Sequence, residues 1–382
     1  MRKEYLVFGS PVIEESEIEE IVQTLRSGWI GTGPKVARFE EEFKKYVGAE
    51  YAIAVASCTA GLHLSVIALG IGAGDEVIVP SMTFAATANA VIHSGAKPVF
   101  VDVDPLTATI DVEDVKRKIT PRTKAIIPVH FGGYACDVEA IRKVADDNNL
   151  YVIHDTAHAL ETEYNGVKIG NYSDISSYSF YVTKNLTTAE GGMITTNNEE
   201  VANKIKIYAL HGMTKDAWKR FSDDGYKHYQ IIFPGFKYNM TDIQASMGIH
   251  QLSRVERLYK RRKEIWERYH HELKNLPLIL PPDPPAHIRH GHHLFTVLID
   301  VARTTVTRDE LMQRLHQMNI GTGVHYIALH LHPYYQSEYG YKNGDFPNAE
   351  FISERTLSLP FSAKLTDEDI MDVISALKEI LG

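Results

Sequence analysis

Short apolar runs rich in β-branched residues alternate with helix-like segments through the first half of the chain, and this alternation constrains the fold most. The predicted elements are, in order, strand 51–56, helix 60–69, strand 76–79, helix 84–93, strand 98–103, strand 123–130, helix 138–148 and strand 151–154. Such alternation is typical of a mostly parallel sheet with helices on its faces. We therefore predict an α/β fold whose ligands bind beyond the carboxyl ends of the strands.

The sequence changes character after about residue 250. The expected elements there are a long charged helix at 251–273, a proline-rich turn at 277–285, a strand at 294–299 and helices at 308–317 and 367–381. We predict a large domain over residues 1–250, which includes an N-terminal segment, and a smaller C-terminal α+β domain over residues 251–382. In the N-terminal segment, residues 14–26 read as a helix with Ile18, Val22 and Leu25 on one face.

The net charge limits the classes of partner that we expect for the chain, and the cysteine content indicates its compartment. Its net charge is −9, from 40 Lys and Arg against 49 Asp and Glu, which argues against a nucleic-acid or anionic-membrane partner. The two cysteines, Cys58 and Cys136, suit a reducing compartment. No apolar run approaches the roughly 20 residues of a membrane span, and no signal-like core follows Met1. We therefore expect a cytoplasmic protein.

Lys184 lies in a short turn between two strand-like runs, residues 175–180 and 193–196. Gly191 and Gly192 follow it and would let the backbone approach a ligand closely. A lysine in a turn is ordinarily a solvated charge. Its surroundings therefore decide whether it does chemistry.

Two polar side chains follow the predicted strand at 151–154. Asp155 stands where this buried strand ends, so it can either cap the next segment or hold a positive charge beyond the sheet. His158 comes three residues later and can face the same pocket, although a lone histidine of this kind is more often structural.

The turn after the first predicted strand is suited to an anion. Thr59, together with the amides of Cys58 to Ala60, lies at a helix N-terminus, where free N–H groups and the helix dipole favour negative charge. A plain helix cap is the ordinary alternative. Ser179 can add a hydroxyl, and Phe84 at the start of the next helix can stack on a flat ring.

An amine, a strand-end carboxylate, an anion cradle and a flat side chain are together the parts of a pyridoxal 5′-phosphate (PLP) site. On this hypothesis Lys184 holds the cofactor aldehyde and Asp155 keeps its pyridine nitrogen protonated, so both are catalytic. His158 could hydrogen-bond the phenolic oxygen of the cofactor. The remaining cofactor-binding candidates are Thr59, Cys58, Ala60, Phe84 and Ser179.

Several sequence blocks, in a specific order and spacing, resemble the sugar-nucleotide aminotransferase family. This family is a branch of the fold-type I PLP enzymes with aspartate-aminotransferase-like architecture. The blocks span nearly the whole chain, at residues 27–35, 80–84, 98–104, 155–158, 179–185, 190–192 and 238–241. The first and last blocks are most similar to the branch that forms UDP-4-amino-4-deoxy-L-arabinose.

The resemblance implies roles for single residues. Lys184 matches the lysine that carries PLP, Asp155 matches the family aspartate, and Thr59 and Ser179 match the phosphate ligands. Asn239 matches an asparagine that reaches the phosphate of the neighbouring subunit, which implies a homodimer with shared active sites. The chain departs from the family at residue 58, where glycine is common, and at residue 154, where glutamate is common.

Four further residues are substrate candidates. Trp29 and Thr32 belong to a loop whose glycines form no dinucleotide fingerprint, because no strand leads into it. Trp29 can pack on a sugar or a base. His325 and Tyr326 are expected to line a pocket where the two domains meet, and by resemblance a histidine in the block at 293–295 lies near that region.

The chain also holds two groups of histidines. They are His287, His290, His292 and His293 in the first group, and His325, His330 and His332 in the second. Neither shows ligand spacing with acidic residues at helical positions, so we assign no metal site. A metal-dependent hydrolase built on these histidines is a distant alternative.

The sequence thus predicts a PLP-dependent aminotransferase that converts a nucleotide-linked ketosugar to an aminosugar, with L-glutamate as the amino donor. The block Glu190-Gly191-Gly192 resembles the carbon-4 enzymes, so a 4-keto sugar is expected and a carbon-3 enzyme is the nearest alternative. A PLP-dependent sugar dehydratase is disfavoured because that branch has histidine in place of Lys184. A PLP-binding regulator without turnover is a further alternative.

Overall fold

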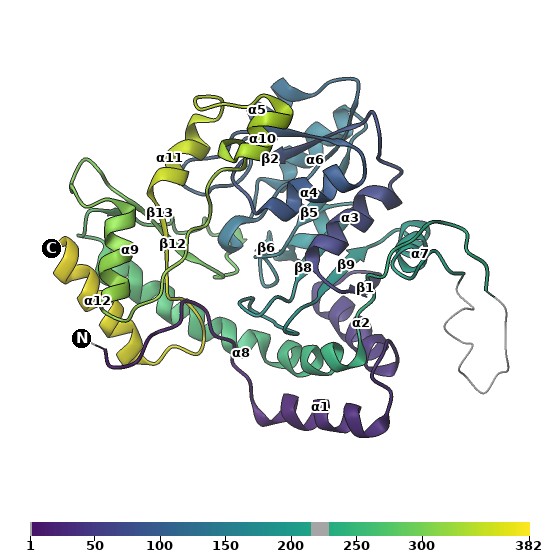
Figure 1. The fold of residues 1–382 in the computed structure, drawn as a ribbon, viewed down its shortest axis with the longest axis horizontal. Coiled ribbons are helices and arrows are strands. Elements are labelled where there is room, and N and C mark those ends of the chain that lie inside the picture. The colour runs from purple at the N-terminus through teal and green to yellow at the C-terminus, as the bar shows by residue number, and fades with distance from the viewer. Residues whose placement is uncertain (1, 215–228) are drawn as a thin grey trace.

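The computed structural model describes residues 2–214 and 229–382, and a seven-stranded mixed sheet forms its centre (Figure 1). The strands are β1 (Tyr51–Val55), β2 (Glu76–Pro80), β3 (Lys97–Val101), β4 (Thr123–Ile126), β5 (Tyr151–Asp155), β8 (Ile175–Ser179) and β9 (Gly192–Thr196). Their order is β1-β9-β8-β5-β4-β2-β3, and in this sheet β9 is antiparallel to both of its neighbours while the other pairs are parallel. The predicted mostly parallel α/β sheet is confirmed.

Helices cover both faces of this sheet, which explains why most residues of its strands are buried. They are α3 (Cys58–Ala68), α4 (Ala85–His93), α5 (Val112–Lys118), α6 (Val138–Asp147) and α7 (Glu199–Tyr208). On β2, Val77 and Val79 pack into one core with α3 and α4, whereas Ile78 packs into another with α5 and α6. Successive strand residues point to opposite faces, so each face of β2 needs its own apolar set.

The strand directions bring several chain segments to one edge of the sheet. The carboxyl ends of the parallel strands β1, β5 and β8 meet there, and antiparallel β9 begins at the same edge. Gly192, the first residue of β9, pairs with both Val55 at the end of β1 and Ser179 at the end of β8. Residues that follow these strands are therefore close in space although they are far apart in sequence.

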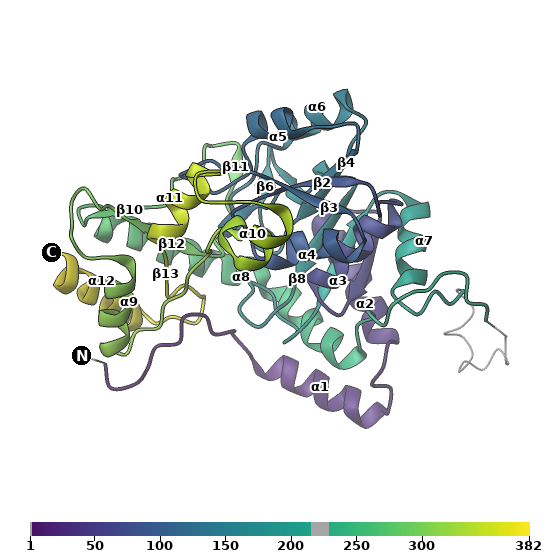
Figure 2. The ribbon, with the colours of Figure 1, turned by 45° about the horizontal axis from the view of Figure 1, so that its top comes forward.

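A second, antiparallel sheet lies beyond this edge (Figure 2). It consists of β10 (Leu278–Ile279), β12 (Phe295–Ile299) and β13 (Thr356–Leu359), with helices α9 (Arg308–Gln317), α10 (Pro333–Tyr339), α11 (Pro347–Arg355) and α12 (Asp367–Leu381). A third, small sheet joins β6 (Glu163–Tyr164) and β7 (Val167–Lys168) to β11 (Ile288–Arg289). Short 3-10 turns are η1 (Phe131–Gly133), η2 (Ile169–Tyr172) and η4 (Leu329–Leu331).

Helix α8 (Asp242–Leu273) connects the two larger sheets and contacts α1 (Glu15–Ser27), α2 (Pro34–Val47) and α12 (Figure 1). It begins before the predicted residue 251 because Thr241 and Gln244 form a reciprocal capping box at its N-terminus. The predicted domain boundary at residue 250 therefore falls inside a helix, and the division into 1–250 and 251–382 stays a prediction. Within the described residues, no helix has the length and apolar character needed to cross a membrane.

Helix α1 packs with its polar side inward. Its buried residues include Glu17, which is 0% exposed and accepts a hydrogen bond from Arg254 of α8 over 2.8 Å. The predicted apolar face points away from α8 instead, with Ile18 47% exposed and Leu25 52% exposed. The helix exists as the sequence predicts, but Ile18 and Leu25 of its apolar face stay exposed in the part of the chain that the structure describes.

Candidate active site

Lys184 lies in the turn between β8 and β9, where its backbone N–H donates to Tyr181 O over 2.9 Å. Its side chain is half-buried, and its Nζ lies 3.5 Å from His293 Nε2. Burial lowers the pKa of Lys184 to about 8, and the neighbouring Cys58 and Asp155 oppose this fall. A substantial fraction of this amine is therefore uncharged near neutral pH, as a nucleophilic lysine requires.

Asp155 is the last residue of β5, and its carboxylate is buried and fixed by two donors. Thr87 Oγ1 donates to Oδ2 over 2.8 Å, and the Ala157 backbone N–H donates to Oδ1 over 3.1 Å. Burial raises the pKa of Asp155, while these hydrogen bonds and the charge of Lys184 act in the opposite direction. The sequence analysis missed Thr87, whose position in the first turn of α4 was its only signal.

The anion cradle forms at the N-terminus of α3. Ser57 caps this helix, since its Oγ accepts from the Ala60 backbone N–H over 3.1 Å. The amide of Ala60 is therefore already bonded, whereas the amides of Cys58 and Thr59 have no hydrogen-bond partner among the described residues. A Cβ on Gly192 would lie 2.7 Å from Cys58 N, so only glycine lets β9 lie against this turn.

The Cys58 side chain turns inward beneath the cradle. Its Sγ lies 3.5 Å from Ser177 O and 4.0 Å from Asp155 Oδ1. Burial raises the pKa of the thiol, and the charge of Asp155 adds to this effect. Cys58 is thus a packed neutral side chain at a position where the family often has glycine. Ser179 lies opposite Gly192, and its Oγ accepts from Tyr181 N over 3.4 Å.

Aromatic and imidazole rings line the site on the side of Asp155. His158 Nδ1 accepts from Gly132 N over 3.2 Å, so its Nε2 carries the hydrogen that faces Tyr326 Oη at 3.3 Å. The ring of Tyr326 lies 5.9 Å from that of Phe84, which is 61% exposed. The structure therefore brings His158, Tyr326 and Phe84 together, with Phe84 at the open side.

His325 lies beside Tyr326 and bonds Ser358 Oγ through Nδ1 over 2.8 Å. Burial lowers the pKa of His325 to about 4, and the charge of Lys184 adds to this effect. Of the two predicted substrate residues, His325 is thus close enough to Lys184 to feel its charge, and Tyr326 contacts His158.

Three predicted residues form a second group, and one of them, Asn239, forms an isolated β-bridge with Val55 at the end of β1. Trp29 Nε1 donates to Thr32 O over 3.2 Å, and Asn239 Nδ2 donates to Thr32 Oγ1 over 2.6 Å. Among the described residues, no hydrogen bond joins Trp29, Thr32 or Asn239 to Lys184 or Asp155. Asn239 Oδ1 is buried and has no hydrogen-bond partner among the described residues.

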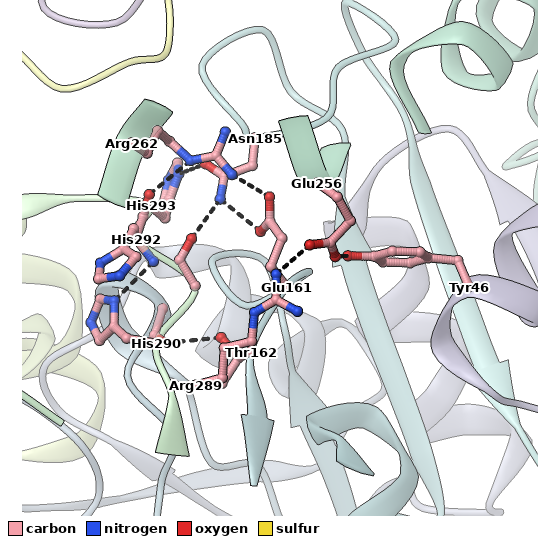
Figure 3. Close-up of polar contacts among 12 residues, drawn as sticks. Tyr46, Glu161, Thr162, Asn185, Glu256, Arg262, Arg289, His290, His292 and His293 are labelled. Atoms are coloured by element: carbon pink, nitrogen blue, oxygen red, sulfur yellow. Dashed lines mark hydrogen bonds and ion pairs between the residues drawn. The ribbon is translucent and has the colours of Figure 1, made fainter. Parts of the chain in front are cut away.

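A buried polar network that the sequence analysis missed surrounds Asn185, the residue after Lys184 (Figure 3). Asn185 bonds both His293 and Glu161, and Glu161 forms an ion pair with Arg262 of α8. Glu161 and Arg262 are 0% and 3% exposed. Only the position of Asn185 next to Lys184 and the expected histidine at 293–295 pointed to this network.

The remaining histidines make internal contacts. His290 Nδ1 accepts from His292 N over 2.8 Å, and His330 lies between Ser81 and Glu350 at 2.6 and 2.9 Å. In residues 2–214 and 229–382, no group of three or more His, Cys, Asp or Glu side chains could hold a metal ion.

Comparison with known proteins identifies the family. The model of the DegT/DnrJ/EryC1/StrS aminotransferase family matches residues 11–378. The chain belongs to this family. It is 48% identical to the spore coat polysaccharide biosynthesis protein SpsC of Bacillus subtilis, over 100% of this chain and 98% of that one. It is 53% identical to an uncharacterized protein of Methanocaldococcus jannaschii, over 100% and 99% of the two chains.

A solved structure of a similar protein indicates the cofactor. The PLP form of Spr1654 from Streptococcus pneumoniae is 33% identical, with a TM-score of 0.91 over 99% of this chain and 100% of that one. The chain is therefore a PLP-dependent sugar aminotransferase with the fold of these enzymes. The predicted family, fold, enzyme class and cofactor are confirmed.

The residues at the sheet edge fit PLP. The donor set contains an amine with a lowered pKa, a buried carboxylate and two free amides at a helix N-terminus. The close approach of Gly192 to the backbone of Ser57 and Cys58 keeps side-chain atoms out of the cradle. These are the groups that the lysine, pyridine and phosphate contacts of PLP require.

Proposed function

We propose that this enzyme transfers the amino group of L-glutamate to a nucleotide-linked 4-keto sugar. One observation carries the proposal: the Lys184 amine, the Asp155 carboxylate and the free amides of α3 all lie at one edge of the central sheet. The block Glu190-Gly191-Gly192 supports a carbon-4 acceptor, and a carbon-3 acceptor is the nearest alternative.

Each residue has a role in this proposal. Lys184 carries the cofactor covalently, and Asp155 holds the proton on its pyridine nitrogen by charge. Thr59, the amides of Cys58 and Thr59, and Ser179 bind its phosphate, while Phe84 and His158 contact its ring. When bound, PLP supplies an electron-withdrawing ring that stabilises negative charge on the α-carbon of the amino donor.

Lys184 also moves the proton that the reaction requires. Once it has released the cofactor, its uncharged amine would take the proton from the α-carbon of the donor and give it to the carbon of the cofactor that held the aldehyde. In the second half-reaction it would move a proton from that carbon to the aminated carbon of the sugar. A lysine with a pKa of about 8 suits both steps, because neither of its protonation states is rare near neutral pH. His325 and Tyr326 line the pocket where the sugar would bind.

We further propose that the enzyme is a homodimer with shared active sites. The exposed apolar face of α1, with Ile18 and Leu25, supports an interface there, since such faces are usually covered. A partner subunit would also bring its own Trp29, Thr32 and Asn239 to the site, since no hydrogen bond among the described residues joins these side chains to Lys184 or Asp155 of the same chain. Asn239 would then contact the phosphate, and Trp29 would pack on the sugar or base.

A panel of 4-keto and 3-keto nucleotide sugars tests the substrate proposal. We expect an aminosugar from a 4-keto sugar with glutamate, and 4-keto-L-arabinose linked to UDP is one member of the panel. Amination of 3-keto sugars alone would overturn the choice of carbon. Release of 2-oxoglutarate in the same assay would identify glutamate as the amino donor.

Borohydride reduction followed by peptide mapping tests the covalent role of Lys184. A pyridoxyl group on residue 184 is expected, and its presence on another lysine would overturn the assignment. The Lys184→Ala variant should lose at least ~10²-fold in rate, because the variant lacks the group that transfers the proton.

A further inference from the structure

His293 directs one ring nitrogen at the reactive lysine and the other at Asn185. Its Nε2 lies 3.5 Å from Lys184 Nζ, and its Nδ1 lies 3.0 Å from Asn185 Oδ1. The first distance is at the long end for a hydrogen bond, which is common for catalytic groups without their ligand. The ring is buried, and it lies 4.5 Å from the ring of His158.

The orientation of Asn185 determines which nitrogen of His293 carries hydrogen. Asn185 Nδ2 is 2.8 Å from Glu161 Oε2 and 3.0 Å from Gly291 O, and both of these partners are acceptors. The amide NH₂ group must therefore point at them, so the amide oxygen points at His293 (Figure 3). His293 Nδ1 consequently donates its hydrogen to Asn185, and the Nε2 lone pair faces Lys184.

A buried ion pair fixes Asn185 in turn. Glu161 pairs with Arg262, whose Nε also donates to His292 O over 3.0 Å. The pair thus ties the loop after β5 to α8 and to the segment that carries His293. Because Glu161 is charged and buried, rotating Asn185 would bring two oxygen acceptors together at a high cost.

We propose that Asn185 and His293 are positioning residues: Asn185 fixes the Nδ1–H tautomer of His293, and His293 Nε2 accepts a hydrogen bond from the Lys184 ammonium group. This contact holds the Lys184 amine in the site and stabilises its charged form. The inference rests on the proposed role of Lys184 as the lysine that carries PLP.

Other groups near Lys184 also affect its charge, but within the described residues only His293 lies within hydrogen-bond distance of its Nζ. Asp155 lies at the end of β5, and Cys58 on α3 has a raised pKa that keeps its thiol neutral. Burial lowers the pKa of both His158 and His293 well below the usual range, and that of His325 to about 4. All three imidazoles are therefore uncharged near neutral pH.

Amine labelling of the full-length, cofactor-free protein tests the inference. Acetic anhydride is applied across pH 6–10, and the acetylated fraction of the peptide that contains residue 184 is measured by mass spectrometry. His293→Asn keeps a donor for Asn185 but removes the nitrogen that faces the lysine. Without this acceptor the pKa of Lys184 should fall by about one, so labelling at pH 7 becomes about fivefold faster while labelling at pH 10 is unchanged.

Two further variants and a control complete the test. His293→Gln restores an acceptor at the position of Nε2 and should label like the wild type. Asn185→Leu frees the tautomer and should label faster at pH 7, which also tests the inference if His293→Asn does not fold. His290→Asn is the matched control, since His290 is as buried as His293 but bonds the His292 backbone.

The proposal is overturned if His293→Asn and His290→Asn show the same pH dependence, or if Asn185→Leu labels like the wild type. Because labelling uses protein without cofactor, it reports the contact between His293 and Lys184 alone. Borohydride mapping separately reports whether Lys184 carries PLP, so the two failures are distinguishable.

Discussion

Thr87 donates its hydroxyl hydrogen to Asp155 Oδ2 over 2.8 Å, and this contact joins α4 to the end of β5. Thr83 Oγ1 lies 2.8 Å from Thr87 Oγ1, so Thr83 must donate to Thr87 in turn. All three side chains are buried. The chain of hydroxyls gives the Asp155 carboxylate one orientation and compensates part of the cost of its burial.

Replacing Thr87 by valine keeps its shape and removes the donor. A hydrogen bond to a charged group is worth about 1.5–3 kcal/mol, so the pKa of Asp155 should rise further and kcat should fall by about tenfold or more. The pH profile of kcat measures this effect, because its acidic limb should move to higher pH. Thr87→Ser restores the donor and should restore the profile.

Asp155→Asn removes the charge of Asp155 completely, so its effect on turnover should be larger than that of Thr87→Val. This variant should fold and bind PLP but lose most turnover, because a neutral amide cannot hold the pyridine proton by charge. If Asp155→Asn turned over normally, both the role of Asp155 and that of Thr87 would be wrong.

The buried amine of Lys184 predicts a stability effect with a definite sign. Its pKa falls from 10.5 to about 8 on folding, so between these values the unfolded chain binds a proton that the folded chain lacks. Stability of the cofactor-free protein should therefore rise with pH across this window, and the charged lysine should destabilise it below pH 8.

Lys184→Met should accordingly raise the free energy of unfolding of the cofactor-free protein at pH 7, by about 1–3 kcal/mol. The gain should shrink toward zero near pH 10. Urea unfolding at both values of pH measures it. Lys45→Met, at a lysine with 69% side-chain exposure, is the control and should change stability by less than ~0.5 kcal/mol. A gain that does not depend on pH would contradict the explanation.

Local patterns predicted most of the central sheet and the edge at which the candidate cofactor residues lie. Lys184, Asp155 and the turn at Cys58 follow strands, and parallel strands end at the same edge, so sequence order alone brings them together. Three elements of the structure differ from the prediction. The strand expected at 123–130 ends at Ile126, α8 begins earlier at its capping box, and α1 buries its polar side.

The polar network around Asn185 could not be predicted from local patterns. Glu161, Arg262 and His293 come from a loop, a helix and a segment before β12, and no periodicity links them. Their pairing is a product of tertiary packing, in which a buried charge must find its partner. The hydrogen bond from Asn239 to Thr32 has a similar origin, since it joins two segments that are 207 residues apart in the sequence.

The ion pair of Glu161 and Arg262 should be essential for stability. Arg262→Met leaves the Glu161 carboxylate buried without its partner, which typically costs about 3–5 kcal/mol. Urea or thermal unfolding measures the loss. Arg38→Met is the matched control, because Arg38 forms an exposed pair with Glu42 on α2 and such pairs are worth less than about 1 kcal/mol. Equal losses in the two variants would contradict the role of the buried pair.

The shared-site proposal predicts that two inactive chains can rescue each other. Lys184→Ala removes the reactive amine, and Asn239→Leu removes the side chain that we assign to the partner's phosphate contact. If Asn239 serves the other subunit, a mixed dimer contains one site with both residues intact and one site with neither. Random mixing of equal amounts should then recover about a quarter of the wild-type activity.

Sedimentation must show a dimer, and tagged chains must confirm that subunits exchange. If each chain instead used its own Asn239, every site in the mixed dimer would carry one lesion and no activity would return. Absence of rescue after verified exchange, or an active monomer, would therefore refute the proposal. Substituting Ile18 and Leu25 with serine tests the interface separately. The dimer should be weaker, because the substitutions remove apolar area that the interface would bury. The resulting monomers should hold PLP less tightly.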